Sequence, residues 1–376
     1  MVWGELKAHP EVLYGAVAAL AIVLALSPAV GRVARVLGAV DRPGRRRLNT
    51  APVPRLGGIA LFLGILVPAL AFLPLGDETR GLLLGAAVAV TVGAIDDVRG
   101  LVWWQKLGGQ IAAAAIPVSF GIWVDRFTFP LVTHPYAALP GWIGVPATML
   151  WIVALMNMVN FLDGLDGLAA GVCAIAGGTF AVIALSLSKP NPAILAAIVC
   201  GACIGFLRHN FYPARIFMGD SGAMLLGFVL ATLSIQGLLK TAATVALFFP
   251  LLVLAVPIID TSFVVARRIK HGEKVYAPDQ AHLHHRFLRR GFSQRRAALT
   301  MWAWCGTLAA AALATRFIPF REGGQWHLGD TVAAAVIGLA ALAFSVYVIY
   351  VLEIVKLTAR SPRRSLDRQD EERQSA

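Results

Sequence analysis

Aspartate and asparagine side chains gather in three short segments of an otherwise apolar chain. The first is the pair Asp96-Asp97, the second is segment 157–167 with the sequence N-M-V-N-F-L-D-G-L-D-G, and the third places Asp220 within F-M-G-D-S-G. Carboxylate and amide oxygens suit Mg²⁺, which usually keeps substrate phosphates in its shell, so one or two protein oxygens can suffice. The three segments therefore indicate chemistry on a phosphorylated substrate.

A fourth polar segment is basic. His282, His284, His285 and Arg286 lie within the five residues H-L-H-H-R. They lack the i, i+4 pair of histidines of a zincin motif, so we predict that they bind phosphate rather than a metal. An earlier arginine-rich loop ends in P-V-P-R-L-G-G at positions 52–58; its arginines either meet phosphates or fix the orientation of the chain in a membrane.

Each aspartate also has a structural interpretation. Asp96 and Asp97 follow a charge-free segment of only 15 residues, 81–95, so they are either an ordinary polar helix end or drawn in toward a membrane surface. Asp220 precedes an apolar segment and could serve as an N-cap. Asp163 has an equally good case for shaping its own loop and for contacting phosphates.

The composition is that of a membrane protein. Hydrophobic residues make up 58% of the 376 positions and charged residues only 14%. Eleven charge-free segments are long enough, or nearly so, to cross a bilayer: 12–31, 57–76, 81–95, 107–124, 142–162, 167–188, 190–207, 221–239, 241–259, 297–315 and 331–352. We predict an all-α, polytopic integral membrane protein with about 11 transmembrane helices.

Basic residues are unevenly divided among the loops between these spans. The loops after odd-numbered spans, together with the C-terminal tail, contain 26 of the 33 lysines and arginines. Because cytoplasmic loops are enriched in these residues, we predict an N-terminus outside and a C-terminus in the cytoplasm. The four polar segments follow the third, fifth, seventh and ninth spans, so all four are expected on the cytoplasmic face.

The distribution of charge also predicts the domain boundaries and the partners of the chain. Residues 1–355 are expected to form one membrane domain, and residues 356–376 a charged, disordered cytoplasmic tail. The net charge of +12 is mostly an orientation signal that also suits membrane lipid or a phosphate-rich substrate; with no supporting motif, we expect no nucleic-acid partner. The four cysteines fall within apolar spans and are expected to be small packing residues.

Together the polar segments resemble those of a known family. Their order, from Asp96-Asp97 through N-x-x-N-x-x-D-G-L-D-G and F-M-G-D-S-G to H-x-H-H-R, is similar to that of the polyprenyl-phosphate N-acetylhexosamine-1-phosphate transferases. The resemblance implies transfer of a sugar-1-phosphate from a UDP-sugar to undecaprenyl phosphate in the bacterial cytoplasmic (inner) membrane, with release of UMP. It also implies a need for Mg²⁺, with Mn²⁺ as a substitute, and allows a homodimer.

The H-L-H-H-R form is similar to the branch that uses UDP-GlcNAc and initiates O-antigen, teichoic acid or related glycans. UDP-MurNAc-pentapeptide and UDP-linked deoxysugars are the alternative donors. One departure lies at Asn49, where relatives often have His or Lys; any role for a basic side chain there would pass to Arg46 or Arg47.

The resemblance also implies roles for individual residues. Asp96, Asp97 and Asp220 match catalytic carboxylates of the family, and Asp220 and Asn160 match the residues on the magnesium side of its active site. One of the paired aspartates is expected to deprotonate the lipid phosphate or to help hold the metal. The substrate-binding positions include one set of residues expected to bind the uridine and another expected to bind the pyrophosphate or the sugar. They are Arg55, Asp163, Gly164, Leu165, Asp166, Phe217, His282, His284, His285 and Arg286, with 164–166 and 217 at the uridine and the last four at the pyrophosphate or sugar.

A secondary transporter is the competing class of function. Such proteins place ionisable groups near the middle of the bilayer and often contain repeats of inverted topology. In this chain the spans are free of charge and the carboxylates gather at one face, which favours the transferase.

Overall fold

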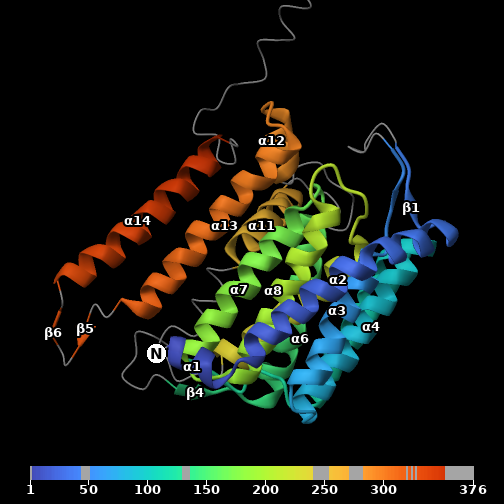
Figure 1. Cartoon of the computed structure of the whole chain (residues 1–376). Helices are drawn as coiled ribbons and strands as arrows, with labels where there is room; N and C mark the ends of the chain where they lie inside the picture. The colour runs from blue at the N-terminus through green and yellow to red at the C-terminus, as the bar shows by residue number, and fades with distance from the viewer. Residues whose placement is uncertain are drawn as a thin grey trace, which may run out of the picture.

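The computed structural model of the chain describes residues 2–43, 51–128, 136–239, 254–270, 283–318, 321–322, 325–326 and 328–351, and these are mostly α-helical (Figure 1). The helices are α1 (Val2–Ala8), α2 (Glu11–Val36), α3 (Gly57–Phe72), α4 (Asp77–Arg99), α5 (Trp103–Ser119), α6 (Gly141–Leu162), α7 (Leu168–Ser186), α8 (Pro190–Asn210), α9 (Gly219–Leu233), the π-helical turn η1 (Ser234–Leu239), α11 (Ala255–Lys270), α12 (Leu283–Arg289), α13 (Gln294–Phe317) and α14 (Leu328–Val351). Short antiparallel hairpins pair β1 (Val40–Asp41) with β2 (Val53–Pro54), β3 (Arg126–Thr128) with β4 (Tyr136–Ala138), and β5 (Arg321–Glu322) with β6 (Gln325–Trp326).

The helices confirm a polytopic membrane protein. Seven of those described are long and apolar enough to cross a membrane: α2, α4, α6, α7, α8, α9 extended into η1, and α13. Helices α3, α5 and α14 lie at further expected spans. Most of the ninth expected span, 241–259, and the tail 356–376 lie outside the described residues.

Helices α7, α8 and α9 form the centre of the bundle. Every residue of α9 from Ser221 to Leu233 is buried, and so is nearly all of α7. Figure 1 shows α2, α3 and α4 on one side of this centre and the α13–α14 pair on the other. Since a helix that is apolar all round is buried by its neighbours, α9 is held on every side, and its first turn is a fixed point for the residues around it.

Helix α4 differs from the expected third span. It runs from Asp77 to Arg99 and has 23 residues, so it continues through the charges at both ends of the 15-residue apolar segment. Acidic residues in its first turn and Arg99 in its last turn suit the helix dipole. A helix of this length extends about 35 Å, more than a bilayer core of about 30 Å. Asp96 and Asp97 therefore form the last turn of a longer helix whose apolar segment is still 15 residues long, and their depth relative to a membrane surface stays a prediction.

Two glycines let α3 and α4 approach the first turn of α9. A Cβ at Gly93 of α4 would lie 2.4 Å from the Cα of Ser221, and one at Gly58 of α3 would lie 2.2 Å from the backbone nitrogen of Gly222. Only a residue without a side chain permits these distances. The backbone that carries Asp220 is therefore packed directly on the helix that carries Asp96 and Asp97.

Candidate active site

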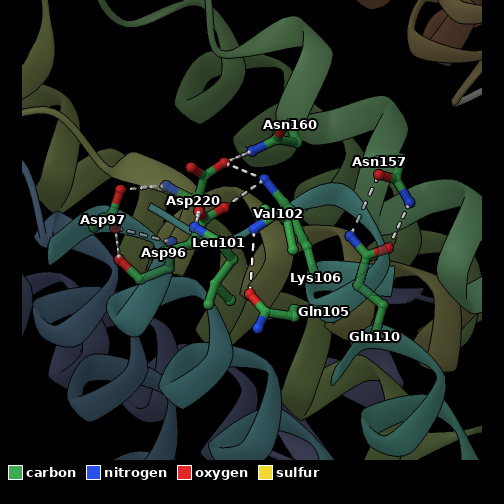
Figure 2. Close-up of polar contacts among 11 residues, drawn as sticks. Asp96, Asp97, Leu101, Val102, Gln105, Lys106, Gln110, Asn157, Asn160 and Asp220 are labelled. Atoms are coloured by element: carbon green, nitrogen blue, oxygen red, sulfur yellow. Dashed lines mark hydrogen bonds and ion pairs between the residues drawn. The ribbon is translucent and has the colours of Figure 1, made fainter. Parts of the chain in front are cut away.

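Asp220 lies at the centre of a polar cluster formed by four helices (Figure 2). The Nζ of Lys106, from α5, is 2.7 Å from Asp220 Oδ1 and 2.9 Å from Asp96 Oδ2. The side-chain amide of Asn160, near the end of α6, donates a hydrogen bond to the same oxygen of Asp220. The structure thus brings together three of the predicted residues, Asp96, Asn160 and Asp220, around a lysine that the sequence analysis had not selected.

Asp97 faces α9 rather than Lys106. Its carboxylate accepts hydrogen bonds from the backbone N–H groups of Asp220 (2.9 Å) and Ser221 (3.1 Å) and from the Ser221 hydroxyl (2.8 Å). The N-cap position of α9 is Met218, so the N-cap interpretation of Asp220 is wrong. Because Asp97 satisfies the first donors of α9 from a neighbouring helix, the Asp220 side chain can turn toward Lys106 and Asn160.

A second pair of side chains joins α5 to α6. The amides of Gln110 and Asn157 exchange hydrogen bonds of 2.9 and 3.3 Å, and Gln110 is buried. Lys106 and Gln110 are spaced i, i+4, and Asn157 and Asn160 are spaced i, i+3, so each pair shares a helix face. These matching spacings were the available signal for Lys106 and Gln110, which sequence reasoning missed.

The segment after α6 holds two more of the predicted aspartates. Asp163 is the C-terminal cap residue of α6 and is half-buried. Burial first, and then the negative charges of Asp220, Asp97 and Asp166, raise the pKa of the Asp163 carboxyl to about 8, although Arg55 acts in the opposite direction. Asp163 is therefore close enough to the cluster to interact with its charges.

Asp166 has a structural partner. Its carboxylate accepts a hydrogen bond of 2.8 Å from the backbone N–H of Ala214. Burial raises the pKa of this carboxyl, and the hydrogen bond from Ala214 lowers it. Of the neighbours assigned to the uridine, Gly164 is exposed and Leu165 is buried. Loop 163–167 is thus tied to the loop that precedes α9.

Phe217 and Arg55 lie on a further wall of the cluster. The Phe217 N–H donates to the Pro54 carbonyl (2.9 Å), and the Gly57 N–H donates to the Phe217 carbonyl (3.0 Å). Arg55 forms an ion pair with the buried Asp41 of β1. The charge of Arg55 also lowers the pKa of Asp163, which indicates that Arg55 lies near the carboxylates.

The predicted basic segment lies on α12, and the buried Phe287 of this helix belongs to the same hydrophobic cluster as Leu162, Leu165 and Leu168 around the loop after α6. His284, His285 and Arg286 lie on α12, at the same end of the molecule as the upper loops in Figure 1, and Arg286 is half-buried. The side chains of the two histidines, and the whole of His282, lie outside the described residues. The predicted place of Arg286 at the pyrophosphate stays a prediction.

The cluster suits a hard divalent cation. Among the described residues there is no group of three or more His, Cys, Asp or Glu side chains arranged as metal ligands. A magnesium ion that keeps waters and substrate phosphates needs fewer protein ligands, and Asp220 and Asn160 offer a carboxylate and an amide side by side. Asp96 adds negative charge beside Lys106, the one cation that contacts Asp220 in the described structure, and this charge favours a further cation.

Comparison with known proteins identifies the family. Glycosyl transferase family 4 matches residues 79–238, which contain Asp96, Asp97, Asn160 and Asp220. The chain is 39% identical over 288 residues to the probable undecaprenyl-phosphate N-acetylglucosaminyl 1-phosphate transferase of Bacillus subtilis (strain 168), covering 76% of this chain and 80% of that protein.

Two further relatives have related names. The chain is 36% identical over 341 residues to decaprenyl-phosphate N-acetylglucosaminephosphotransferase of Mycobacterium leprae (strain TN), covering 83% and 85% of the two chains. It is 35% identical over 298 residues to phospho-N-acetylmuramoyl-pentapeptide-transferase of Desulforudis audaxviator (strain MP104C), covering 72% and 86%. These matches confirm the resemblance of the polar segments to the polyprenyl-phosphate N-acetylhexosamine-1-phosphate transferases, and the chain belongs to glycosyl transferase family 4.

Proposed function

We propose that this protein transfers N-acetylglucosamine 1-phosphate from UDP-GlcNAc to undecaprenyl phosphate, releasing UMP and initiating a cell-envelope glycan. The observation that carries the proposal is the convergence of Asp96, Asn160 and Asp220 around Lys106 at one end of a membrane bundle. Of the relatives that share most of the chain, one is named as an undecaprenyl-phosphate N-acetylglucosaminyl 1-phosphate transferase and another as a decaprenyl-phosphate N-acetylglucosaminephosphotransferase. The secondary transporter is not supported by any of them.

The reaction replaces the phosphoanhydride bond of the UDP-sugar with a phosphoanhydride bond to the lipid phosphate. A phosphate oxygen of the acceptor lipid attacks the β-phosphorus of the UDP-sugar, a new P–O bond forms, and the bond to UMP breaks, with UMP taking its electron pair. A magnesium ion bound by Asp220 and Asn160 would neutralise negative charge on the diphosphate. Lys106 holds Asp220 and Asp96 in place, and its ammonium group would supply a second positive charge to a phosphate bound beside Asp220.

The paired aspartates divide their work in this proposal. Asp97 is a positioning residue, since its carboxylate already holds two backbone N–H groups and the hydroxyl of Ser221. Asp96 contacts Lys106 and accepts a hydrogen bond of 2.7 Å from the Leu101 N–H. Of the pair, Asp96 is thus the better candidate to contact the acceptor phosphate or the metal.

The orientation and location of the protein belong to the same proposal. We place the active site on the cytoplasmic face of the bacterial inner membrane, with eleven crossings, the N-terminus outside and the C-terminus in the cytoplasm. The division of basic residues among the loops supports this orientation. Reporters inserted after residue 8 and after residue 351 of the full-length chain test this orientation. Equal reporter signals at the two positions would contradict the odd number of crossings. A homodimer is the proposed assembly.

A transferase assay with purified protein tests the activity directly. Undecaprenyl phosphate is supplied with radiolabelled UDP-GlcNAc, UDP-GalNAc, UDP-MurNAc-pentapeptide or UDP-linked deoxysugars, and lipid-linked product and UMP are measured. We expect UDP-GlcNAc to be the best donor, with activity lost in EDTA and restored by Mg²⁺ or Mn²⁺. UDP-MurNAc-pentapeptide is the second candidate, because a 35% identical relative is named for it. No lipid product with any donor would overturn the proposal.

A further inference from the structure

A basic cavity of about 310 Å³ lies at the end of α2, apart from the carboxylate cluster. Its lining includes Pro28, Arg32 and Arg35 of α2, His209 at the end of α8, and Arg215 and Ile216 of the following loop. The described lining thus contains three arginines and no acidic residue. A cavity with this lining is suited to an anion with a small apolar portion.

The cavity continues into an apolar stripe along α2. Leu13, Val17, Leu24 and Pro28 are exposed and follow one another at intervals that keep them on one helix face. Arg32 and Arg35 continue the same face and are exposed as well. At 1.5 Å per residue, the apolar part of this stripe extends for about 22 Å before the arginines begin, which exceeds the depth of one leaflet of a bilayer core of about 30 Å.

This pattern matches an amphiphile better than a soluble ion. If the phosphate of a phospholipid bound at the arginines, the acyl chains of the same lipid would lie beside Leu24, Val17 and Leu13. The polar end of the cavity is also preorganised, because His209 Nε2 is 3.0 Å from the Leu24 carbonyl oxygen, which holds the ring between α8 and α2.

The loop between α8 and α9 separates the cavity from the active site. Ala214 donates its N–H to Asp166, on the active-site side, whereas its neighbour Arg215 lines the cavity. Gly31 of α2 lies against Ile216, since a Cβ there would be 3.7 Å from its Cδ1. A ligand at the cavity would therefore contact the loop that leads into Asp220 at Arg215, next to the residue that binds Asp166.

From this geometry we propose that the cavity binds the phosphate headgroup of an anionic glycerophospholipid, with the acyl chains along the exposed face of α2. Positive charge at the cytoplasmic ends of helices also orients membrane proteins and suits helix C-termini. Those roles require only charge near the membrane surface. A cavity formed by two helices and a loop, with an apolar stripe leading away from it, offers a lipid both a headgroup site and a face for its acyl chains.

Native mass spectrometry of the delipidated full-length protein tests the proposal. Phosphatidylglycerol or phosphatidylcholine with the same acyl chains is titrated into wild type, the double variant Arg32→Gln/Arg35→Gln, and the single variant Arg215→Gln. The wild type is expected to prefer phosphatidylglycerol. The double variant is expected to bind it about tenfold more weakly or worse, because each basic residue near an anionic surface contributes a factor of about five.

A matched control removes two arginines elsewhere at the same end of the molecule. Arg289→Gln/Arg296→Gln changes the net charge equally, and both side chains are exposed and lie outside the cavity lining. The control is expected to bind phosphatidylglycerol as the wild type does, and elution of every variant as a single folded species excludes misfolding.

Four results of the binding and kinetic measurements would overturn the proposal. The first is equal binding of the two phospholipids to the wild type, and the second is an equal loss of binding in the control variant. The third is saturation of the cavity by inorganic phosphate alone. The fourth is that undecaprenyl phosphate displaces phosphatidylglycerol and that the variants change only the KM for this acceptor. A cross-link between α2 helices of two copies that is insensitive to lipid would also overturn it, because the stripe would then be a dimer contact.

Discussion

The two halves of the candidate site are built in different ways. In the carboxylate half, formed by Asp96, Asp97, Asn160 and Asp220, side chains bind one another across α4, α6 and α9, and Gly93 brings two backbones into contact. The basic half, around Arg286, lies on a seven-residue helix that is anchored by buried Phe287, whose ring meets that of Phe292 edge-on with centroids 5.2 Å apart. Under the proposed function, the carboxylate half, here called the rigid half, would hold the metal and the reacting phosphates. The half around Arg286, here called the adaptable half, would bind the donor.

Replacing Asp220 should have the largest effect. Asp220→Asn keeps the shape of the side chain but removes the charge that holds Lys106 and would hold the metal. We expect transferase activity to fall by about 10³-fold or more, with normal folding, since the effect falls on charge stabilisation in the reaction. The matched control is Asp77→Asn, at the exposed opposite end of α4. Near-normal activity in Asp220→Asn would remove the carboxylate half from the mechanism.

Lys106 tests whether the carboxylate half needs its own cation. In Lys106→Gln the carboxylates of Asp96 and Asp220 lose their shared partner, and we expect kcat to fall by about 10²-fold. Because the ammonium occupies one oxygen of Asp220, its removal should at the same time strengthen Mg²⁺ binding, measured by calorimetry on the substrate-free protein. Lys106→Arg should restore part of the activity. A variant with weaker Mg²⁺ binding would show that Lys106 does not compete with the metal.

The missed role of Lys106 shows where sequence reasoning stops. The polar segments could be recognised because rare charges stand out in an apolar chain, and both the polytopic membrane class and the grouping of Asp96, Asn160 and Asp220 are confirmed. Lys106 had been counted only as a charge that orients the chain. Its role depends on how α5 packs against α6 and α9, and local sequence does not specify the contact of residues 114 positions apart.

Gly93 tests how the rigidity arises. A methyl group at this position would collide with the Ser221 backbone, so Gly93→Ala must push α4 away from α9 and disturb the hydrogen bonds of Asp97. We expect a loss of about 1–3 kcal/mol in stability and a fall in activity of about tenfold. Gly108→Ala on α5 is the control, because its Cβ would meet nothing within 4 Å. Thermal unfolding and initial rates measure both, and equal behaviour of the two variants would show that the close approach is not required.

Arg286 tests the adaptable half. If it binds the donor equally in the ground and transition states, Arg286→Gln should raise KM for UDP-GlcNAc by about tenfold or more with little change in kcat and in unfolding temperature. Arg289→Gln, one turn further along α12 and exposed, is the control. A large fall in kcat would place Arg286 with the reacting groups and would end the functional contrast between the halves.

The smallest expected effect is the pH dependence due to Asp163. Its pKa of about 8 in the folded protein exceeds the value of about 3.9 in an unfolded chain, so the folded state binds more protons between these pH values. The contribution of this carboxyl to stability is therefore complete below about pH 4 and is lost as the pH rises through 8. One proton allows a slope of at most about 1.4 kcal/mol per pH unit, and solvent screening of this half-buried group lowers its pKa and so narrows the pH range over which the slope applies.

Thermal unfolding in EDTA at pH 6, 7 and 8 measures this slope. Asp163→Asn should give a flatter dependence than the wild type and the Asp77→Asn control. Added Mg²⁺ should flatten the wild-type dependence as well, because a cation near Asp220 makes ionisation of Asp163 less unfavourable. Parallel slopes for wild type and Asp163→Asn would mean that Asp163 is already ionised at neutral pH. Arg55 or solvent would then have to balance its charge, and the carboxylate half would hold one more negative charge before any metal binds.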